Sequence, residues 1–210
     1  MKFIKSQLVD IDKIVECYIS AFPMTLSSKL GRRFLAKMFE WYVVSERGFI
    51  FHSEQNNTVT GFCGGIITKT PGLPGAITSI SQYAFYTFII SYLLKPHLIF
   101  HPQNLKKINY ILKNILIKLK IIKAEKKVFK SNFQPFCGLV VIGVKKSFQG
   151  QGLGYKIMKE FEKNARSLKY IKFISLSVKK KNIKAINTYK KSGWSVDKKL
   201  NNSIKFIKYL

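Results

Sequence analysis

The segment VKKSFQGQGLG, residues 144–154, decides the fold of this chain. It follows an apolar run from Leu139 to Val144 that is typical of a buried strand. It precedes a stretch from Leu153 to Leu168 whose apolar residues recur at helical spacing. A turn in this place presents successive backbone N–H groups at a helix N-terminus, where the helix dipole also favours an anion. Gly152 and Gly154 would let the backbone approach a pyrophosphate without a Cβ in the way.

A glycine-rich turn between a strand and a helix is compatible with several sites, including a nucleotide site of another fold, and also with a plain tight turn. It is not a P-loop, because no Gly-Lys-Ser/Thr sequence follows the glycines. A Rossmann site is disfavoured, because no acidic residue ends the next predicted strand, Ile171 to Val178. The turn alone therefore predicts an anion site and does not name the anion.

A second motif follows: Val178-x-x-x-Asn182-x-x-Ala185-Ile186-x-x-Tyr189-x-x-x-Gly193-Trp194. Together with Gln149-x-x-Gly152-x-Gly154, it resembles the paired motifs of the GNAT superfamily of acyl-CoA N-acyltransferases. The resemblance is strong over residues 138–196, moderate over the N-terminal strands and helices, and absent over 76–130. It implies one α+β domain over residues 1–210, with a mixed, mostly antiparallel central sheet flanked by helices. It also implies acetyl-CoA as the cosubstrate, and no metal.

The resemblance also implies roles for particular residues. Backbone groups of the strand carrying Ile142 and Val144 would pair with the pantetheine arm, which Asn182 would also touch, and an amide near Val144 would help the carbonyl oxyanion. The amides that would hold the pyrophosphate belong to Gln149, Gly150, Gln151, Gly152, Leu153, Gly154 and Tyr155. Tyr189 would protonate the departing thiolate, which suits a phenol whose ordinary pKa is near 10. Asn182 and Tyr189 are seven residues apart and so share one helix face, although Tyr189 could also simply fill the core.

The sequence offers few candidates for the base that would take a proton from the acceptor amine. An amine must lose a proton before it attacks, and the strand from Leu139 to Val144 carries no acid. His52, Glu54, His97 and His101 remain as candidates for the base, and each fits a structural or surface role better. We therefore nominate no base from the sequence.

The rest of the chain predicts alternating strands and helices. The expected elements are a strand at Phe3–Leu8, a helix capped by Asp10 that ends at Ala21-Phe22-Pro23, a helix from about Ser28, a hairpin of 48–53 with 58–68, a helix at Asn182–Ser192, and two edge strands in the tail. An edge strand near the C-terminus leaves homodimerisation open.

Residues 76–130 differ in composition from the rest of the chain and predict a helical insertion. An aromatic stretch from Tyr83 to Leu94 is followed by an amphipathic pattern from Leu105 to Ile122, with lysines such as Lys106 and Lys113 on the polar face. The plain interpretation is a surface helix that covers the sheet, and the alternative is peripheral contact with an anionic membrane. A transmembrane span is disfavoured, because the apolar run from Ala84 falls far short of about 20 residues.

The composition is strongly basic, with 37 Lys and Arg against 10 Asp and Glu, which gives a formal charge of +27. This charge favours an anionic partner, but no recognised nucleic-acid motif accompanies it, so no specific nucleic acid is expected. The three cysteines lie in apolar surroundings and predict buried free thiols in a reducing compartment. The start MKFIKSQLVDIDKI carries no secretory signal pattern, so we expect a cytoplasmic protein, with a peripheral membrane location as the alternative.

These observations predict an N-acetyltransferase that moves an acetyl group from acetyl-CoA directly to a primary amine of a small molecule. A loose likeness to GNAT proteins found with surface-polysaccharide genes suggests an amino sugar or sugar nucleotide as the acceptor. Two alternatives stay open. The chain could be a non-catalytic GNAT-fold module that binds anionic membrane or nucleic acid through a basic helix, or a protein or peptide N-acetyltransferase.

Overall fold

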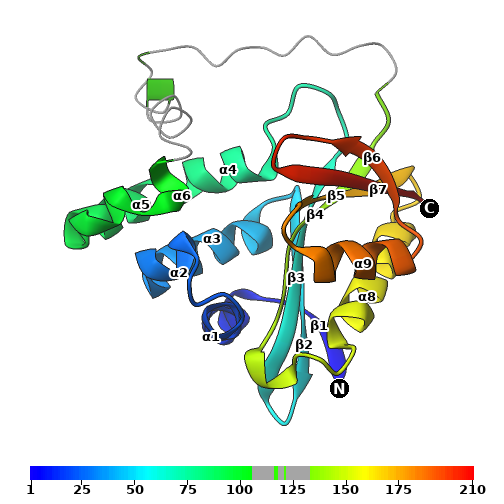
Figure 1. The fold of residues 1–210 in the computed structure, drawn as a ribbon, viewed down its shortest axis with the longest axis horizontal. Coiled ribbons are helices and arrows are strands. Elements are labelled where there is room, and N and C mark those ends of the chain that lie inside the picture. The colour runs from blue at the N-terminus through cyan, green and yellow to red at the C-terminus, as the bar shows by residue number, and fades with distance from the viewer. Residues whose placement is uncertain (106–115, 118–120, 122–132) are drawn as a thin grey trace.

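The computed structural model describes residues 1–105, 116–117, 121 and 133–210, and it is built around one seven-stranded sheet (Figure 1). The strands are β1 (Lys2–Lys5), β2 (Gly48–Gln55), β3 (Thr58–Thr68), β4 (Phe136–Val144), β5 (Phe173–Lys179), β6 (Ser195–Lys199) and β7 (Ser203–Tyr209). Their order across the sheet is β1-β2-β3-β4-β5-β7-β6, and only the β4–β5 pair is parallel among these strands. The predicted α+β fold with a mixed, mostly antiparallel sheet is confirmed.

Helices cover both faces of this sheet (Figure 1). One face packs against α1 (Ile11–Ala21) and α3 (Arg32–Val44), in a cluster where the rings of Phe39 and Phe62 meet edge to face at 5.3 Å. The other face packs against α8 (Leu153–Ser167) and α9 (Ile183–Lys191). Successive strand residues such as Phe62 and Cys63 belong to opposite clusters, as the alternation of a strand requires. The sheet is therefore buried on both sides through most of its length.

The N-terminal elements correct three predictions. β1 ends at Lys5, and a 3-10 turn, η1 (Leu8–Asp10), precedes α1. Asp10 stands at the N-cap of α1, but its carboxylate accepts from the Gln7 N–H at 2.8 Å and so closes the preceding turn instead of capping the helix. The single helix expected from about Ser28 is two helices, α2 (Leu26–Leu30) and α3, because Gly31 between them has a φ of +106° that ends the first.

The β2–β3 hairpin is confirmed, and its turn is shorter than predicted, because β2 continues to Gln55 instead of ending at residue 53. Asn56 and Asn57 have φ values of 49° and 58°. Two consecutive left-handed residues form the type I′ turn whose twist matches that of the flanking strands, and asparagine tolerates this conformation better than most residues.

The predicted helical insertion is present between β3 and β4, and its described elements are α4 (Ala76–Tyr83), α5 (Phe85–Leu94), η2 (Pro96–Phe100) and α6 (Pro102–Leu105). The predicted basic helix, Leu105 to Ile122, lies largely outside the described residues. The insertion packs against α2 and α3 through a third apolar cluster that contains Leu30, Phe34 and Leu98. The Tyr83 hydroxyl also donates to the Glu40 carboxylate on α3.

No single helix among those described has the length and hydropathy of a membrane span. The helices α4 and α5 have the required length and hydropathy only when they are counted as one segment, and they are bent by 66° relative to each other.

The C-terminal tail differs from its prediction in strand order. β6 is an edge strand and is exposed throughout, whereas β7 lies between β5 and β6, where Phe206 is fully buried opposite Leu176. The expectation of two edge strands is therefore right for β6 and wrong for β7. α9 (Ile183–Lys191) ends close to its predicted boundary, and Gly193, just after it, takes a φ of +78° that is typical of the residue that follows a helix. All three cysteines are buried free thiols, as predicted.

Candidate active site

The candidate site begins where β4 and β5 stop pairing. Their parallel ladder runs only from Phe136–Phe173 to Leu139–Leu176. Immediately after it, Gly64 of β3 lies opposite Val141 and Gly65 opposite Leu139, so Val140 is the extra residue of a β-bulge. Val140 and Val141 both pack on the α1/α3 side, while Leu139 and Ile142 both pack on the α8 side. The bulge and the end of the ladder together leave one backbone edge of residues 140–144 unpaired with β5.

The backbone groups on this open edge can be identified. The Lys145 N–H donates to the Thr60 carbonyl of β3 at 2.9 Å, so strand alternation turns Val144 away from β3. The Gln149 side chain donates from Nε2 to the Val144 carbonyl at 2.9 Å, from the open side. Ile142, two residues earlier, faces the same edge by alternation. A linear ligand lying here can therefore pair with Ile142 and with the Val144 N–H, the two positions predicted for pantetheine.

The glycine-rich turn takes a conformation that requires glycine. Gly150 and Gly152 have φ values of +84° and +73°, and Gly152 is the N-cap of α8. A Cβ built on either residue meets no atom within 4 Å, so their side chains would face open space. A Cβ on Gly154 would make only an ordinary contact with Val144 at 3.8 Å. Within the protein, the first two glycines are required for their backbone angles rather than by crowding.

Two of the seven amides predicted to bind pyrophosphate already have partners. The Gln149 N–H donates to the Lys146 carbonyl at 3.3 Å, and the Tyr155 N–H donates to the Gly152 carbonyl at 3.1 Å. Within the described part of the chain, the N–H groups of residues 150–154 have no partner. These five amides lie at the N-terminus of α8, where an anion is favoured. The predicted anion site is thus narrowed to residues 150–154.

A cavity lies between the open edge of β4, the start of α8 and the first turns of α9, and α9 forms one of its walls. Asn182 is the N-cap of this helix, and its Oδ1 accepts from the Ala185 N–H at 3.2 Å. Its side-chain oxygen thus has a structural role, while its NH₂ group has no partner among the described residues. Asn182 and Tyr189 both line the same cavity, which confirms that they share one helix face.

Tyr189 fills the core and also reaches the cavity. Its ring packs 6.2 Å from Trp194 and 5.9 Å from Phe206, and the residue is only 8% exposed. Tyr189 lines the cavity, and its hydroxyl has no hydrogen-bond partner among the described residues. Burial, with a smaller contribution from Cys63, raises the pKa of Tyr189 to about 12. The hydroxyl therefore keeps its proton throughout the neutral pH range.

The cavity has a volume of about 450 Å³ and is lined by residues of β4, the glycine-rich turn, α8 and α9. Ala21 and Phe22, at the end of α1, form a wall that sequence reasoning missed, because the Ala-Phe-Pro segment carries only a helix-stop signal. Lys184 was also missed, and it is the only charged residue among the described residues lining the cavity. Gln151 does not line it, since its side chain donates to the Ser147 carbonyl at 3.3 Å.

The four residues considered as bases lie elsewhere. His52 is buried against Ser6, at 2.9 Å between Nδ1 and Oγ, and burial lowers its pKa. Glu54 pairs with Lys13 at 3.5 Å. His97 lies in η2, and His101 follows it in the insertion. No carboxylate or histidine lines the cavity among the described residues, so the structure also nominates no base.

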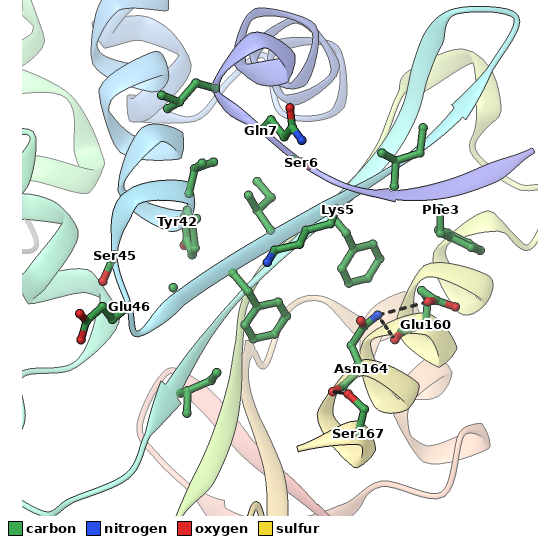
Figure 2. Close-up of a pocket in the computed structure, with 18 of the residues that line it drawn as sticks. Phe3, Lys5, Ser6, Gln7, Tyr42, Ser45, Glu46, Glu160, Asn164 and Ser167 are labelled. Atoms are coloured by element: carbon green, nitrogen blue, oxygen red, sulfur yellow. Dashed lines mark hydrogen bonds between the residues drawn. The ribbon is translucent and has the colours of Figure 1, made fainter. Parts of the chain in front are cut away.

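A larger cavity, of about 960 Å³, lies at the β1 edge of the sheet (Figure 2). Its walls include Phe3 of β1 and the C-terminal half of α8, where Asn164 donates to Glu160 at 3.2 Å. It contains none of the predicted site residues, and its polar side chains on α8 bond to one another or to their own helix. The smaller cavity is therefore the candidate active site. Among the described residues, no three His, Cys, Asp or Glu side chains gather closely enough to hold a metal ion.

Comparisons with known proteins found one matching family and a set of similar solved structures. Residues 123–194 match the model of the acetyltransferase (GNAT) family, whose members are acyl-CoA-dependent acetyltransferases, and this segment contains β4, the glycine-rich turn and α9. No curated protein sequence matches the chain significantly. The resemblance to the GNAT superfamily is confirmed by this match and by solved structures that share the fold.

Three of these structures are similar along nearly their whole lengths. The ribosomal-protein-S18-alanine N-acetyltransferase of Escherichia coli is 13% identical, with a TM-score of 0.56 over 99% of this chain and 92% of that chain. Arabidopsis thaliana NAA60, solved in complex with acetyl-CoA, is 12% identical, with a TM-score of 0.57 over 100% and 98%. The protein PH1933 from Pyrococcus horikoshii OT3 is 17% identical, with a TM-score of 0.56 over 100% and 98%.

Proposed function

We propose that the chain, which has the GNAT fold, is an N-acetyltransferase that transfers an acetyl group from acetyl-CoA directly to a primary amine. The observation that carries the proposal is the convergence of three features on one cavity. These are the open backbone edge of β4, the five unpaired amides at the start of α8, and the hydroxyl of Tyr189. The match of residues 123–194 to an acetyltransferase family supports the same activity.

Acetyl-CoA would bind along the open edge of β4 and the start of α8, with its acetyl group in the cavity. Backbone groups of Ile142 and Val144 would pair with the amides of the pantetheine arm, as a further strand would. The N–H groups of residues 150–154 would hold the pyrophosphate, and Lys184 would add a positive charge on the α9 wall. The NH₂ group of Asn182 would be left to contact the pantetheine, since its oxygen caps α9.

Direct transfer forms one C–N bond and breaks one C–S bond. The amine nitrogen attacks the thioester carbonyl, and the Ile142 N–H, near Val144 on the same open edge, could bond the developing oxyanion while the Val144 N–H pairs with pantetheine. Tyr189 would give its proton to the departing sulfur, and the phenol is fully protonated at neutral pH because burial raises its pKa to about 12. The proton that the amine loses passes to solvent, since no described side chain in the cavity is a suitable base, and Tyr189 takes a proton back from solvent, which restores the phenol.

The acceptor we propose is a small-molecule amine that carries negative charge, such as an amino sugar or its nucleotide. The charge of +27 favours an anionic acceptor over a cationic one. A protein N-terminus is the second candidate, favoured by the likeness to the S18-alanine N-acetyltransferase. We place the protein in the cytoplasm, where acetyl-CoA and reduced thiols coexist. A homodimer could form through the exposed β6 edge.

Isothermal titration with acetyl-CoA and CoA at two salt concentrations tests the site directly. Wild-type protein should bind both saturably, and Gly152→Glu should bind neither, because its side chain would enter the open space before the unpaired amides. If folded wild-type protein binds neither ligand, the enzyme proposal is wrong.

A Tyr189→Phe variant tests the chemistry. We expect CoA release with a panel of amines to fall by about 10²–10⁴ while the affinity for CoA stays unchanged, because only the proton donor is lost. Tyr209→Phe, an exposed tyrosine on β7, is the matched control and should keep full activity. Unchanged turnover in Tyr189→Phe would remove Tyr189 from the mechanism.

A further inference from the structure

The helix α5 in the insertion is apolar on two faces. Its inner face places Phe88 and Tyr92 against Leu30 and Phe34, with the rings of Phe34 and Phe88 at 6.0 Å. Its outer face carries Tyr86, Ile90 and Leu93, spaced four and three residues apart. They are 73%, 46% and 76% exposed. A helix that is apolar all round belongs in a protein core or a lipid environment, and only half of α5 is in a core.

Further exposed apolar side chains follow directly along the chain. Leu94 is 71% exposed at the end of α5, and Ile99 and Phe100 in η2 are 49% and 75% exposed. We call the six side chains of Tyr86, Ile90, Leu93, Leu94, Ile99 and Phe100 the arm patch. Single exposed apolar residues are normal in proteins, but six large ones on two consecutive elements indicate an interaction surface. In Figure 1, α5 extends away from the sheet at one end of the molecule.

The charge around the arm patch identifies the partner. Residues 55–124 contain no Asp or Glu, so no carboxylate accompanies the patch anywhere along its own segment of chain. Lys95, which joins α5 to η2, donates to the Lys29 carbonyl at 2.9 Å and so brings two lysines to the end of the patch. An apolar surface that has lysines at its end, on a segment of chain without acids, is complementary to an anionic bilayer, which offers both acyl chains and phosphates.

The geometry favours docking on the bilayer over crossing it. α5 has 10 residues and therefore spans about 15 Å, half of a hydrocarbon core. Its partner α4 is bent from it by 66° and buries Ala76 and Ile80 against the main domain. The helix α5 can therefore lie in the headgroup region with its outer face inserted. It cannot span the membrane, because α4 and the inner face of α5 are held in the protein core.

We propose that α5 and η2 form a docking surface for an anionic phospholipid bilayer, with the arm patch inserted among the acyl chains. This surface is separate from the candidate active site and does not depend on the proposed activity. Binding needs both parts: the apolar patch for insertion and the surrounding lysines for attraction to the anionic headgroups.

Flotation with vesicles of phosphatidylcholine, with and without phosphatidylglycerol, tests the proposal at physiological and high salt. The test variant is Leu93→Ser/Leu94→Ser/Phe100→Ser, which changes no charge and no buried residue. The control is Val9→Ser/Val44→Ser/Val196→Ser, three exposed apolar residues elsewhere. Thermal melts and acetyl-CoA titration establish that both variants are folded.

We expect wild type and the control to bind anionic vesicles, and the test variant to bind about tenfold more weakly or not at all. A Leu94→Trp variant should show a blue-shifted emission on anionic vesicles, because its new indole enters the acyl region. Both native tryptophans are buried in the protein.

Three results would overturn the proposal. Equal vesicle binding by the test and control variants would assign the binding to charge alone. Failure of folded wild type to bind anionic vesicles at physiological salt would exclude the membrane. A stable dimer that only the test variant dissociates, measured by light scattering, would show that a second copy covers the arm patch.

Discussion

The carboxylate of Glu162 in α8 lies behind the candidate active site in a buried ionic network. It is 4% exposed and accepts from Trp194 Nε1 at 2.9 Å, from Lys208 Nζ at 2.9 Å and from Lys159 Nζ at 3.3 Å. Lys208 also donates to the Ser192 carbonyl at the end of α9, at 2.8 Å. The network therefore joins α8, α9 and β7 around Trp194, on which Tyr189 packs.

The Glu162→Gln substitution should destabilise the fold by about 3 kcal/mol. The amide keeps an acceptor for Trp194 but leaves Lys208, only 17% exposed, without its counter-ion, and breaking a buried pair from one side costs about 3–5 kcal/mol. We expect the lower end of that range, because the amide oxygen still accepts one hydrogen bond. Lys159, at 42% exposure, adds at most about 1 kcal/mol. For a chain of this size the Tm should fall by about 6–12 °C.

Urea unfolding of a double-mutant cycle measures the effect. Glu162→Gln and Lys208→Met should each be destabilising, and the double variant should recover about 2 kcal/mol of the summed loss, because it leaves no buried charge unpaired. Glu160→Gln, on the same helix, is the control and should cost less than about 1 kcal/mol. If Glu162→Gln costs less than about 0.5 kcal/mol, or if the two substitutions simply add, the pair is solvated and the reasoning is wrong.

Since the neutral form of Tyr189 is lost only as pH rises through about 12, kcat should show no decline due to this residue up to about pH 10, which a pH profile of wild type checks. Gly152→Ala should lose about 1–2 kcal/mol through its positive φ and bind acetyl-CoA more weakly in titration, whereas Gly75→Ala, at a φ of −66° with no neighbour within 4 Å, should not destabilise. Burial raises the pKa of all three thiols, to about 12 for Cys17 and Cys137, so a thiol reagent at neutral pH should label none of them until urea unfolds the chain.

The parts of the site that depend on local sequence were predictable. Residues 139–168 have the pattern of a strand, a glycine-rich turn and an amphipathic helix. This pattern is readable from the sequence because side-chain periodicity and the absence of a Cβ act over a few residues. The shared face of Asn182 and Tyr189 follows from helical spacing alone. Each of these features is present in the structure where the pattern placed it.

The opening between β4 and β5 could not be predicted, because it depends on where two distant strands stop pairing. The bulge at Val140 arises from its register with Gly64 and Gly65, and no pattern within β4 signals it. The Phe22 wall comes from a segment more than a hundred residues away in the chain. The position of β7 within the sheet was likewise not predictable. The last strand inserts between β5 and β6, and strand propensity does not determine the order of strands.

The insertion leaves the sheet and returns to it at a single point. Thr68, the last residue of β3, is the register partner of Phe136, the first residue of β4. Closing a loop of this length instead of a tight turn costs about 2–3 kcal/mol, which the β3–β4 ladder must offset. A chain that joined Thr68 to Phe136 by a short turn would therefore keep the order of the strands, because no described strand lies within the insertion. It would also uncover part of two cores: Leu30 and Phe34 would lose Leu98, and the cluster on the α1 and α3 face would lose Ala76 and Ile80.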